Sequence, residues 1–176
     1  MFLPVVLLNL SLGCGLSAQS QSHADPAGLA LAKPGQKITR VKIGDIQNRL
    51  QNPDTLYVVN FWATWCSPCV AELPEFNRLD SAWMGKPVKV LLVSLDFTES
   101  WPSKLNGFIL KKHIKPDVCW LDESDANAFI PMISANWSGA IPATLFSLKS
   151  KNMHDFHEGK VDFEFMNDKI RTALKN

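Results

Sequence analysis

The chain has 176 residues, enough for one compact domain with a sizeable core once an N-terminal targeting segment is removed. Its 18 Lys and Arg residues nearly balance 17 Asp and Glu residues, which argues against a nucleic-acid-binding protein or a polybasic membrane-surface protein. The four cysteines are too few and too unevenly spaced for a disulfide scaffold.

The N-terminal segment is typical of a secretion signal, although it lacks the usual basic residues. Its apolar run over residues 2–12 is too short to span a bilayer, and small residues follow in GCGLSAQS. Two processing routes remain open: cleavage after Ala18, or acylation of Cys14, because SLGC is similar to a lipobox. Both routes place the domain in the periplasm or cell envelope, with a lipid anchor at Cys14 in the second case. We expect a signal over residues 1–18 and a flexible leader rich in small and polar residues over 19–37.

The remaining residues, 38–176, alternate between strand and helix patterns. Apolar runs predict strands, and amphipathic spacing predicts helices. In chain order we expect a strand at 37–43, a helix at 44–52, a buried strand at 55–62, a helix at 68–83, a second buried strand at 87–97, a helix at 101–114, a strand at 117–122, a helix at 124–133, an antiparallel strand pair at 143–150 and 153–161, and a closing helix at 163–176. This order predicts an α/β domain with a mixed central sheet covered by helices on both faces.

The segment FWATWCSPC holds two cysteines where an apolar strand pattern gives way to a helix. A strand that ends at Trp65 would deliver Cys66 to the helix N-terminus, where unpaired N–H groups and the helix dipole stabilise a thiolate. Cys66 is therefore the expected exposed nucleophile. Cys69 lies one turn inside, where it can attack a mixed disulfide and release the partner. Pro68 fixes the backbone of the intervening turn, so the sequence favours a redox-active dithiol.

Two other uses of this cysteine pair fit less well. A structural zinc site needs about four ligands, but Cys14 lies in the signal and Cys119 stands alone, where we expect a buried strand thiol. A purely structural disulfide across so short a loop removes little chain entropy and contributes little stability. We therefore expect no metal ligands in this segment.

The segment resembles the active-site stretch of the thioredoxin superfamily, and the resemblance runs from about Lys37 to the C-terminus. Pro74, eight residues after Cys66, corresponds to the proline that kinks the family's active-site helix. GAIPAT places Ile141 and Pro142 where the family carries its cis-proline facing the dithiol, a bond for which the cis form costs little. The unit DVCWLDESDANAFIPMI resembles the strand-helix insertion of the branch that includes TlpA and ResA.

The resemblance also bears on the proton that must leave the second cysteine. Thioredoxin has a buried aspartate six residues before its first active-site cysteine, and here that position is Asn60, which cannot accept a proton. The TlpA and ResA branch has a glutamate that corresponds to Glu72. This residue lies one helical turn beyond Cys69, where burial would raise its pKa toward that of a general base. The alternative is a solvated helix glutamate without a role in the chemistry.

The remaining site assignments follow from the same resemblance. Pro142 is expected to act beside the dithiol, and a partner is expected to dock on Trp65, Ser67, Pro68 and Ile141. No cofactor is implied apart from the redox-active disulfide between the two cysteines. The dipeptide between them lacks the histidine found there in oxidising relatives, which favours a reductant.

The implied function is that of an extracytoplasmic thiol-disulfide oxidoreductase that reduces its substrates. Its partners would be oxidised cysteine-containing envelope proteins, such as apocytochrome c, and a membrane thiol-disulfide protein that supplies electrons. A peroxiredoxin-like thiol peroxidase fits less well, because ATWCSPC lacks the threonine-rich loop before the peroxidatic cysteine. A Sco-like copper chaperone fits less well too, because that family spaces its cysteines CxxxC.

Overall fold

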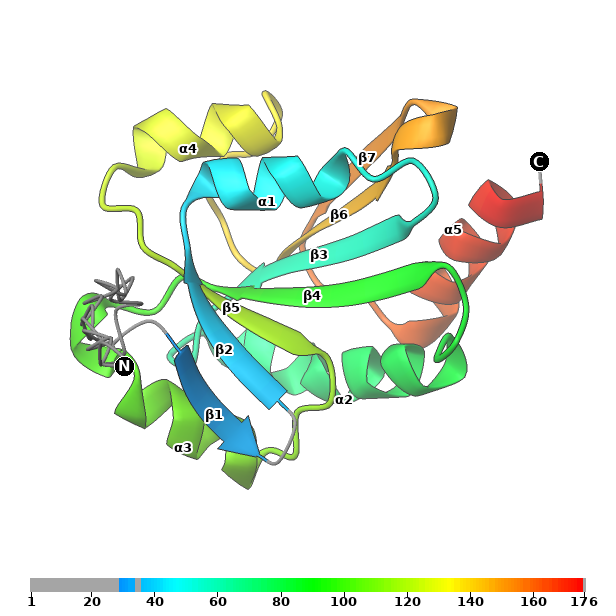
Figure 1. Cartoon of the computed structure of the whole chain (residues 1–176). Coiled ribbons are helices and arrows are strands. Elements are labelled where there is room, and N and C mark those ends of the chain that lie inside the picture. Colours follow the sequence, from blue (N-terminus) through cyan, green and yellow to red (C-terminus); the bar gives the residue numbers. More distant parts are fainter. Residues whose placement is uncertain (1–28, 34–35, 176) are drawn as a thin grey trace, which may run out of the picture.

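The computed structural model describes residues 29–33 and 36–175 (Figure 1). The strands are β1 (Leu29–Lys33), β2 (Gln36–Val41), β3 (Leu56–Trp62), β4 (Val88–Ser94), β5 (Asp117–Leu121), β6 (Ala143–Leu148) and β7 (Met153–Glu158). The helices are α1 (Ile43–Leu50), α2 (Ser67–Ala82), α3 (Ser103–Lys111), α4 (Ala126–Ile133) and α5 (Phe163–Lys175), with short 3₁₀ turns η2 (Thr98–Ser100) and η3 (Lys149–Lys151).

The strands form one mixed sheet in the order β1-β2-β5-β4-β3-β6-β7. The four strands β2, β5, β4 and β3 run parallel to one another, while β6 pairs antiparallel with β3 and β7 pairs antiparallel with β6. Every residue of β3 from Val58 to Trp62 is buried, as expected for a continuous apolar strand covered on both faces. This strand leads directly into the cysteine segment.

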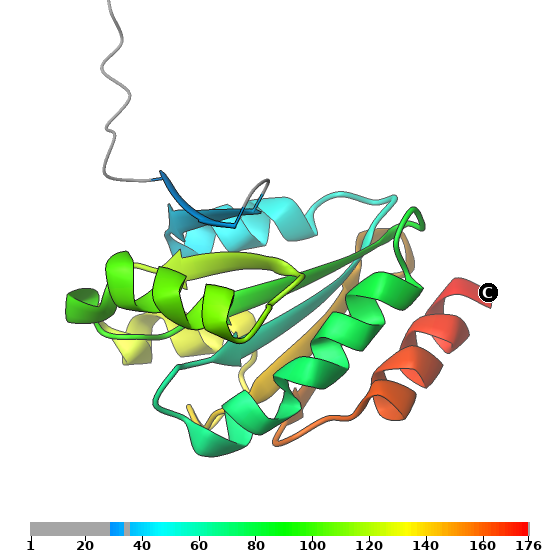
Figure 2. The same ribbon diagram turned by 90° about the horizontal axis from the view of Figure 1, so that it is seen from below.

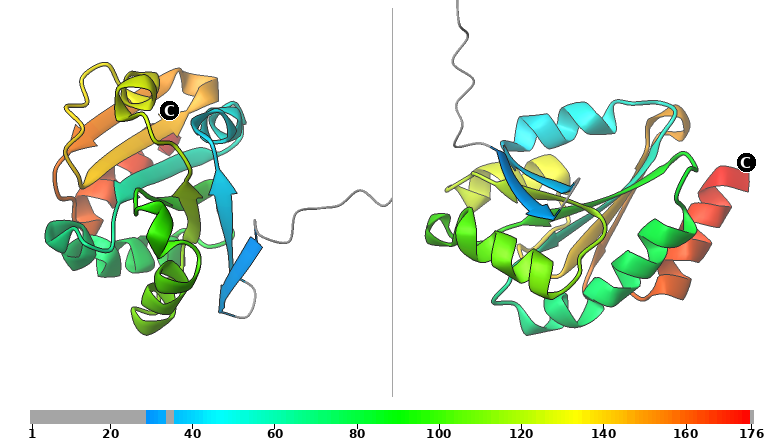
Figure 3. Two further views of the ribbon diagram at one scale, coloured as in Figure 1. Left: turned by 90° about the vertical axis from the view of Figure 1, so that its left-hand side faces the viewer. Right: turned by 60° about the horizontal axis from the view of Figure 1, so that its bottom comes forward.

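The helices divide between the two faces of the sheet. One core lies between the sheet and α2, α3 and α5, and the other lies between the sheet and α1 and α4. Figure 2 shows α2 and α5 side by side, and both views of Figure 3 show α1 and α4 on the face opposite α2 and α3. Alternate residues of β3 enter different cores: Val58 and Trp62 pack on the α2 side, Val59 and Phe61 on the α1 side. Asn60 lies between Val59 and Phe61 and therefore faces α2.

The predicted α/β architecture is confirmed, including the antiparallel pair of β6 and β7 and the closing helix α5. The predicted inserted unit corresponds to β5 and α4, and β5 lies inside the sheet between β2 and β4. Cys119 is a buried free thiol in β5. Among the described helices, none is long and apolar enough to cross a lipid bilayer.

The expectation of a flexible leader over residues 19–37 is wrong at its end. Residues Leu29–Lys33 form β1, which pairs antiparallel with β2, and β2 itself begins at Gln36. The open edge of β2 offers backbone N–H and C=O groups with which a short segment can pair whatever its composition. The expected signal, residues 1–18 with Cys14, and the first part of the leader lie outside the described residues.

Candidate active site

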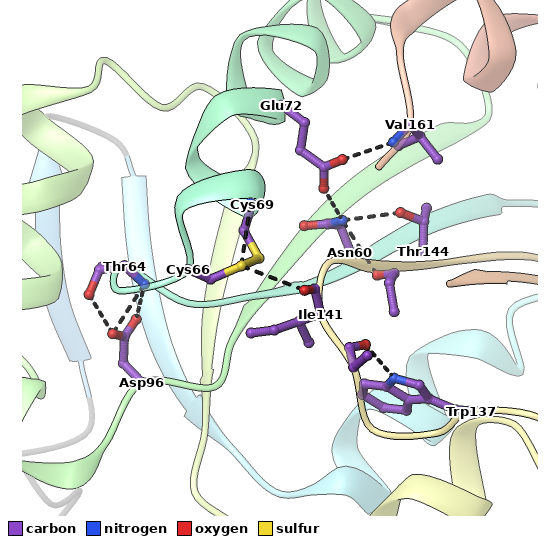
Figure 4. The surroundings of a disulfide bond; sticks show 12 residues. Asn60, Thr64, Cys66, Cys69, Glu72, Asp96, Trp137, Ile141, Thr144 and Val161 are labelled. Atoms are coloured by element: carbon purple, nitrogen blue, oxygen red, sulfur yellow. Dashed lines mark hydrogen bonds between the residues drawn. A yellow bond between two sulfur atoms is a disulfide. The ribbon is translucent and has the colours of Figure 1, made fainter. Parts of the chain in front are cut away.

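The two cysteines lie at the N-terminus of α2 and form a disulfide (Figure 4). The strand β3 ends at Trp62, as the strand predicted at 55–62 does, so it does not continue to Trp65; a short connection leads to Cys66, the N-cap residue. The backbone N–H of Cys69 donates to the Cys66 Sγ at 3.3 Å. Pro68 occupies the first turn, where its missing N–H leaves no helical hydrogen bond unmade. When the bond is reduced, this helix terminus favours negative charge on Cys66.

The two sulfurs differ in how a partner can reach them. Cys66 keeps 6% of its surface exposed, less than expected for an attacking nucleophile, whereas Cys69 is fully buried. An external disulfide therefore meets Cys66 first. Cys69 can act only on a bond that has already formed at its neighbour.

The loop before β6 approaches the disulfide from the other side. The Ile141–Pro142 peptide bond is cis, and the Ile141 carbonyl oxygen lies 3.7 Å from the Cys66 Sγ. In the reduced protein, a Cys66 thiol at this distance can donate to that carbonyl. The structure thus brings the GAIPAT segment next to the cysteine pair (Figure 4).

Glu72 is buried on the same helix, one turn beyond Cys69, so it is not a solvated surface residue: its exposed fraction is 1%. Its Oε1 accepts a hydrogen bond from Asn60 Nδ2 at 2.9 Å, and its Oε2 accepts one from the Val161 backbone N–H at 2.9 Å. Burial raises the pKa of Glu72 from 4.5 to about 7, although these two hydrogen bonds and the positive charge of Lys160 oppose the rise. A carboxylate with this pKa can accept a proton near neutral pH.

Asn60 anchors the carboxylate to the sheet. Its Nδ2 also lies 3.1 Å from Thr144 Oγ1 and 3.4 Å from the Ala143 carbonyl oxygen, both on β6. Within the described residues its Oδ1 has no hydrogen-bond partner. At the position where thioredoxin carries an acid, this chain therefore has an amide that donates to an acid on the helix.

A second buried carboxylate, Asp96, was missed by the sequence analysis. It accepts hydrogen bonds from the Thr64 backbone N–H at 3.1 Å, from the Thr64 hydroxyl, and from Ser94 Oγ at 2.7 Å. The Trp120 indole N–H donates to the Asp96 carbonyl oxygen at 2.7 Å. Asp96 thus fixes the connection that carries Cys66, and the only sequence signal is an aspartate just after the end of an apolar strand.

An exposed aromatic pair borders the cysteines. Trp65 is 55% exposed and stacks on Phe97, which is 66% exposed, with ring centroids 5.8 Å apart. Ser67 and Pro68 are also exposed, and Ile141 is partly exposed. The residues expected to dock a partner therefore surround Cys66, and Phe97 extends this surface from a segment that the sequence analysis did not single out.

Comparisons with known proteins agree with this fold. Residues 37–106 match the thioredoxin family model. The chain is 50% identical over 42 residues to the thiol-disulfide oxidoreductase ResA of Oceanobacillus iheyensis (24% of this chain, 22% of the relative). It is 28% identical over 101 residues to ResA of Bacillus anthracis (56% and 58%). It is 32% identical over 89 residues to the thiol:disulfide interchange protein DsbE homolog of Paracoccus denitrificans (46% and 50%). The chain thus spans less than three fifths of the length of these curated relatives.

Solved structures share the fold. A thioredoxin-related protein from Neisseria meningitidis serogroup B superposes with a TM-score of 0.60 at 21% identity, covering 69% of this chain and 86% of that one. StoA from Bacillus subtilis superposes with a TM-score of 0.53 at 19% identity, covering 81% and 96%. These structures show that the chain shares their fold, and the match of residues 37–106 to the thioredoxin family model agrees with it. In sequence, the chain is similar to about half the length of the ResA and DsbE-homolog thiol-disulfide proteins.

Proposed function

We propose that this protein is an extracytoplasmic thiol-disulfide oxidoreductase that reduces disulfides in other proteins through Cys66 and Cys69. The observation that carries the proposal is a disulfide at a helix N-terminus with a buried carboxylate of pKa about 7 one turn away. A structural disulfide needs no proton acceptor, whereas a dithiol that turns over does.

Reduction of a substrate proceeds in two exchange steps. The Cys66 thiolate attacks one sulfur of the substrate disulfide, which forms a mixed disulfide and releases the other substrate sulfur as a thiolate. The Cys69 thiol then transfers its proton to Glu72, and the resulting thiolate attacks the Cys66 sulfur. The bond between Cys66 and the substrate breaks, its electron pair leaves with the substrate sulfur, and the protein ends in the oxidised form. Two electrons have passed to the substrate.

Glu72 suits the second step because its pKa lies near the working pH. At neutral pH about half of the carboxyl groups are ionised and ready to accept a proton, and the protonated half can return one in the reverse reaction. The Ile141 carbonyl lies beside Cys66, and the cis bond to Pro142 follows it, so an extended substrate segment can align next to the reacting sulfur. The exposed pair of Trp65 and Phe97 offers apolar surface for the same partner.

The cellular setting is part of the proposal. The secretion-signal pattern of residues 1–18, with cleavage after Ala18 or acylation of Cys14, supports a periplasmic or envelope location. The substrates would then be oxidised envelope proteins. Relatives named as thiol-disulfide oxidoreductases support the reaction class. Because each turnover leaves the protein oxidised, a membrane thiol-disulfide protein must restore the dithiol. We take an oxidised CxxCH peptide, as in apocytochrome c, as the first substrate to test.

The test is reduction of that peptide by stoichiometric amounts of reduced protein. Wild type should convert the peptide to its dithiol, Cys66→Ser should be inactive, and Cys69→Ser should stop at a mixed disulfide that non-reducing gels reveal. Accumulation of the mixed disulfide with Cys66→Ser instead would show that the nucleophile is misassigned. Failure of the wild type to reduce any protein disulfide would refute the proposed activity.

A further inference from the structure

Glu72 borders a pocket that does not include the disulfide. The pocket has a volume of about 390 Å³ and lies between α2 and the loop that joins β7 to α5. Its lining residues are Ala71, Glu72, Glu75, Lys160, Val161 and Asp162. The carboxylate thus has two sides. Oε1 faces Asn60 on the sheet, whereas Oε2 is bonded to the loop that lines the pocket.

The loop from β7 to α5 links Glu72 to the segment that faces Cys66. The Gly159 backbone N–H donates to the Pro142 carbonyl oxygen at 2.8 Å, and the Val161 N–H donates to Glu72. Lys160 lies between these two attachment points. Gly159 adopts a φ of +119°, a conformation open to glycine but strained for other residues.

The far end of the loop is fixed as well. Asp162 Oδ1 accepts a hydrogen bond from the Phe165 N–H at 2.8 Å in the first turn of α5, and the Phe163 N–H donates to Glu75 Oε2 at 3.3 Å. Because hydrogen bonds hold both ends of the loop, the backbone of Lys160 has a defined position at the edge of the pocket, and its side chain is exposed. Its charge is therefore kept close to the buried carboxylate.

We propose that Lys160 is a positioning residue. The loop that joins Pro142 to Glu72 holds Lys160 near the carboxylate, and the positive charge of Lys160 favours the ionised form of Glu72 that accepts the Cys69 proton. This inference rests on the proposed role of Glu72 as general base. In the resolving step, the proton of the Cys69 thiol moves to Glu72, the S–S bond between the cysteines forms, and the partner leaves with the electrons of the broken bond. A nearby cation favours the ionised carboxylate that this step consumes.

Among the residues that line this pocket, Lys160 is the one with a positive charge. From α2 comes Glu75, and from the loop comes Asp162, both acidic. On the sheet side, Asn60 and Thr144 are neutral. Lys160 accordingly opposes the effect of burial on the pKa of Glu72.

The first test measures the titration of Glu72 in the oxidised protein by carboxyl ¹³C NMR, with the resonance assigned through Glu72→Gln. Lys160→Met should raise the pKa of Glu72 by about half a unit, the size expected for one exposed charge, and Lys160→Arg should leave it unchanged. Lys104→Met, which removes an exposed lysine from α3, is the matched control and should also leave it unchanged. A Lys160→Met titration that matches the control would overturn the inference.

The second test measures the rate at which Cys69 resolves a preformed mixed disulfide between pH 5 and 9. Lys160→Met should slow this step about threefold at pH 6, where less carboxylate is available, and leave it unchanged at pH 9. In a Glu72→Gln background, Lys160→Met should have no pH-dependent effect. Slowing by one factor at every pH would indicate a merely structural role and contradict the inference. The NMR result stands apart from turnover, so a failure of Glu72 as base and a failure of Lys160 remain distinguishable.

Discussion

Replacing Glu72 by Gln should change how the stability of the oxidised protein depends on pH. Burial holds the pKa of Glu72 at about 7 in the folded protein, against an ordinary value of 4.5. Between these two values the folded state holds a proton that the unfolded chain has lost. The stabilisation is therefore fully present below pH 4.5 and is lost as the pH rises to 7.

The size of the effect follows from the interval between the two pKa values. Each pKa unit corresponds to about 1.4 kcal/mol, so the interval amounts to about 3 kcal/mol of unfolding free energy. Glu72 is 1% exposed, so solvent screening does not reduce this figure greatly. Gln does not titrate. The Asn60 Oδ1, which has no hydrogen-bond partner in the described structure, can accept a hydrogen bond from the amide of the introduced glutamine once the Asn60 side-chain amide is flipped. Glu72→Gln should therefore gain about 3 kcal/mol relative to wild type between pH 4 and pH 8.

The assay is urea unfolding of both oxidised proteins at several pH values across that range, with two-state behaviour checked by two probes. Glu99→Gln, which alters an exposed glutamate in η2, is the control and should track wild type. If the difference between Glu72→Gln and wild type is the same at pH 4 and pH 8, then Glu72 does not have a raised pKa. Glu72 would then be ionised throughout the working range and would be a poor general base for Cys69.

Three further changes probe the rest of the site. Asn60→Asp should introduce a proton acceptor beside the dithiol and, in single-turnover kinetics, speed resolution mainly in a Glu72→Gln background. Equal effects with and without Glu72 would contradict the assignment of Glu72 as the general base. Trp65→Ala should raise KM for a protein substrate about tenfold while reduction of the protein by dithiothreitol stays unchanged, and an unchanged KM would remove Trp65 from the docking surface. Asp96→Asn should lower the unfolding free energy by about 2 kcal/mol at pH 7 in urea melts, because it weakens the contacts to Thr64 and Ser94, and no loss would show that these contacts contribute little.

The sequence predicted those features whose signal is local. The apolar runs of β3 and β4 identify central strands, and the spacing of Cys66, Cys69 and Glu72 places all three on the first turns of one helix. The resemblance to the thioredoxin superfamily added the position of Pro142. Each of these signals spans only a few residues, so a reading along the chain can detect it.

The features that the sequence did not reveal depend on contacts between distant segments. The Val161 N–H that binds Glu72 and the Asp96 that fixes Thr64 become neighbours of the site only when the sheet forms. Phe97 joins Trp65 in the same way. The pairing of β1 was missed because an edge strand obtains its hydrogen bonds from the backbone, which leaves no pattern in the side chains.

The assignment as a reductant is tested most directly by the equilibrium redox potential of the Cys66–Cys69 pair. Purified protein is equilibrated in dithiol buffers of defined potential, and the reduced fraction is measured by thiol alkylation and mass spectrometry. A midpoint near that of thioredoxin, about −270 mV, is the predicted result. A midpoint near that of a strong oxidant, about −120 mV, would contradict the proposed direction of electron flow.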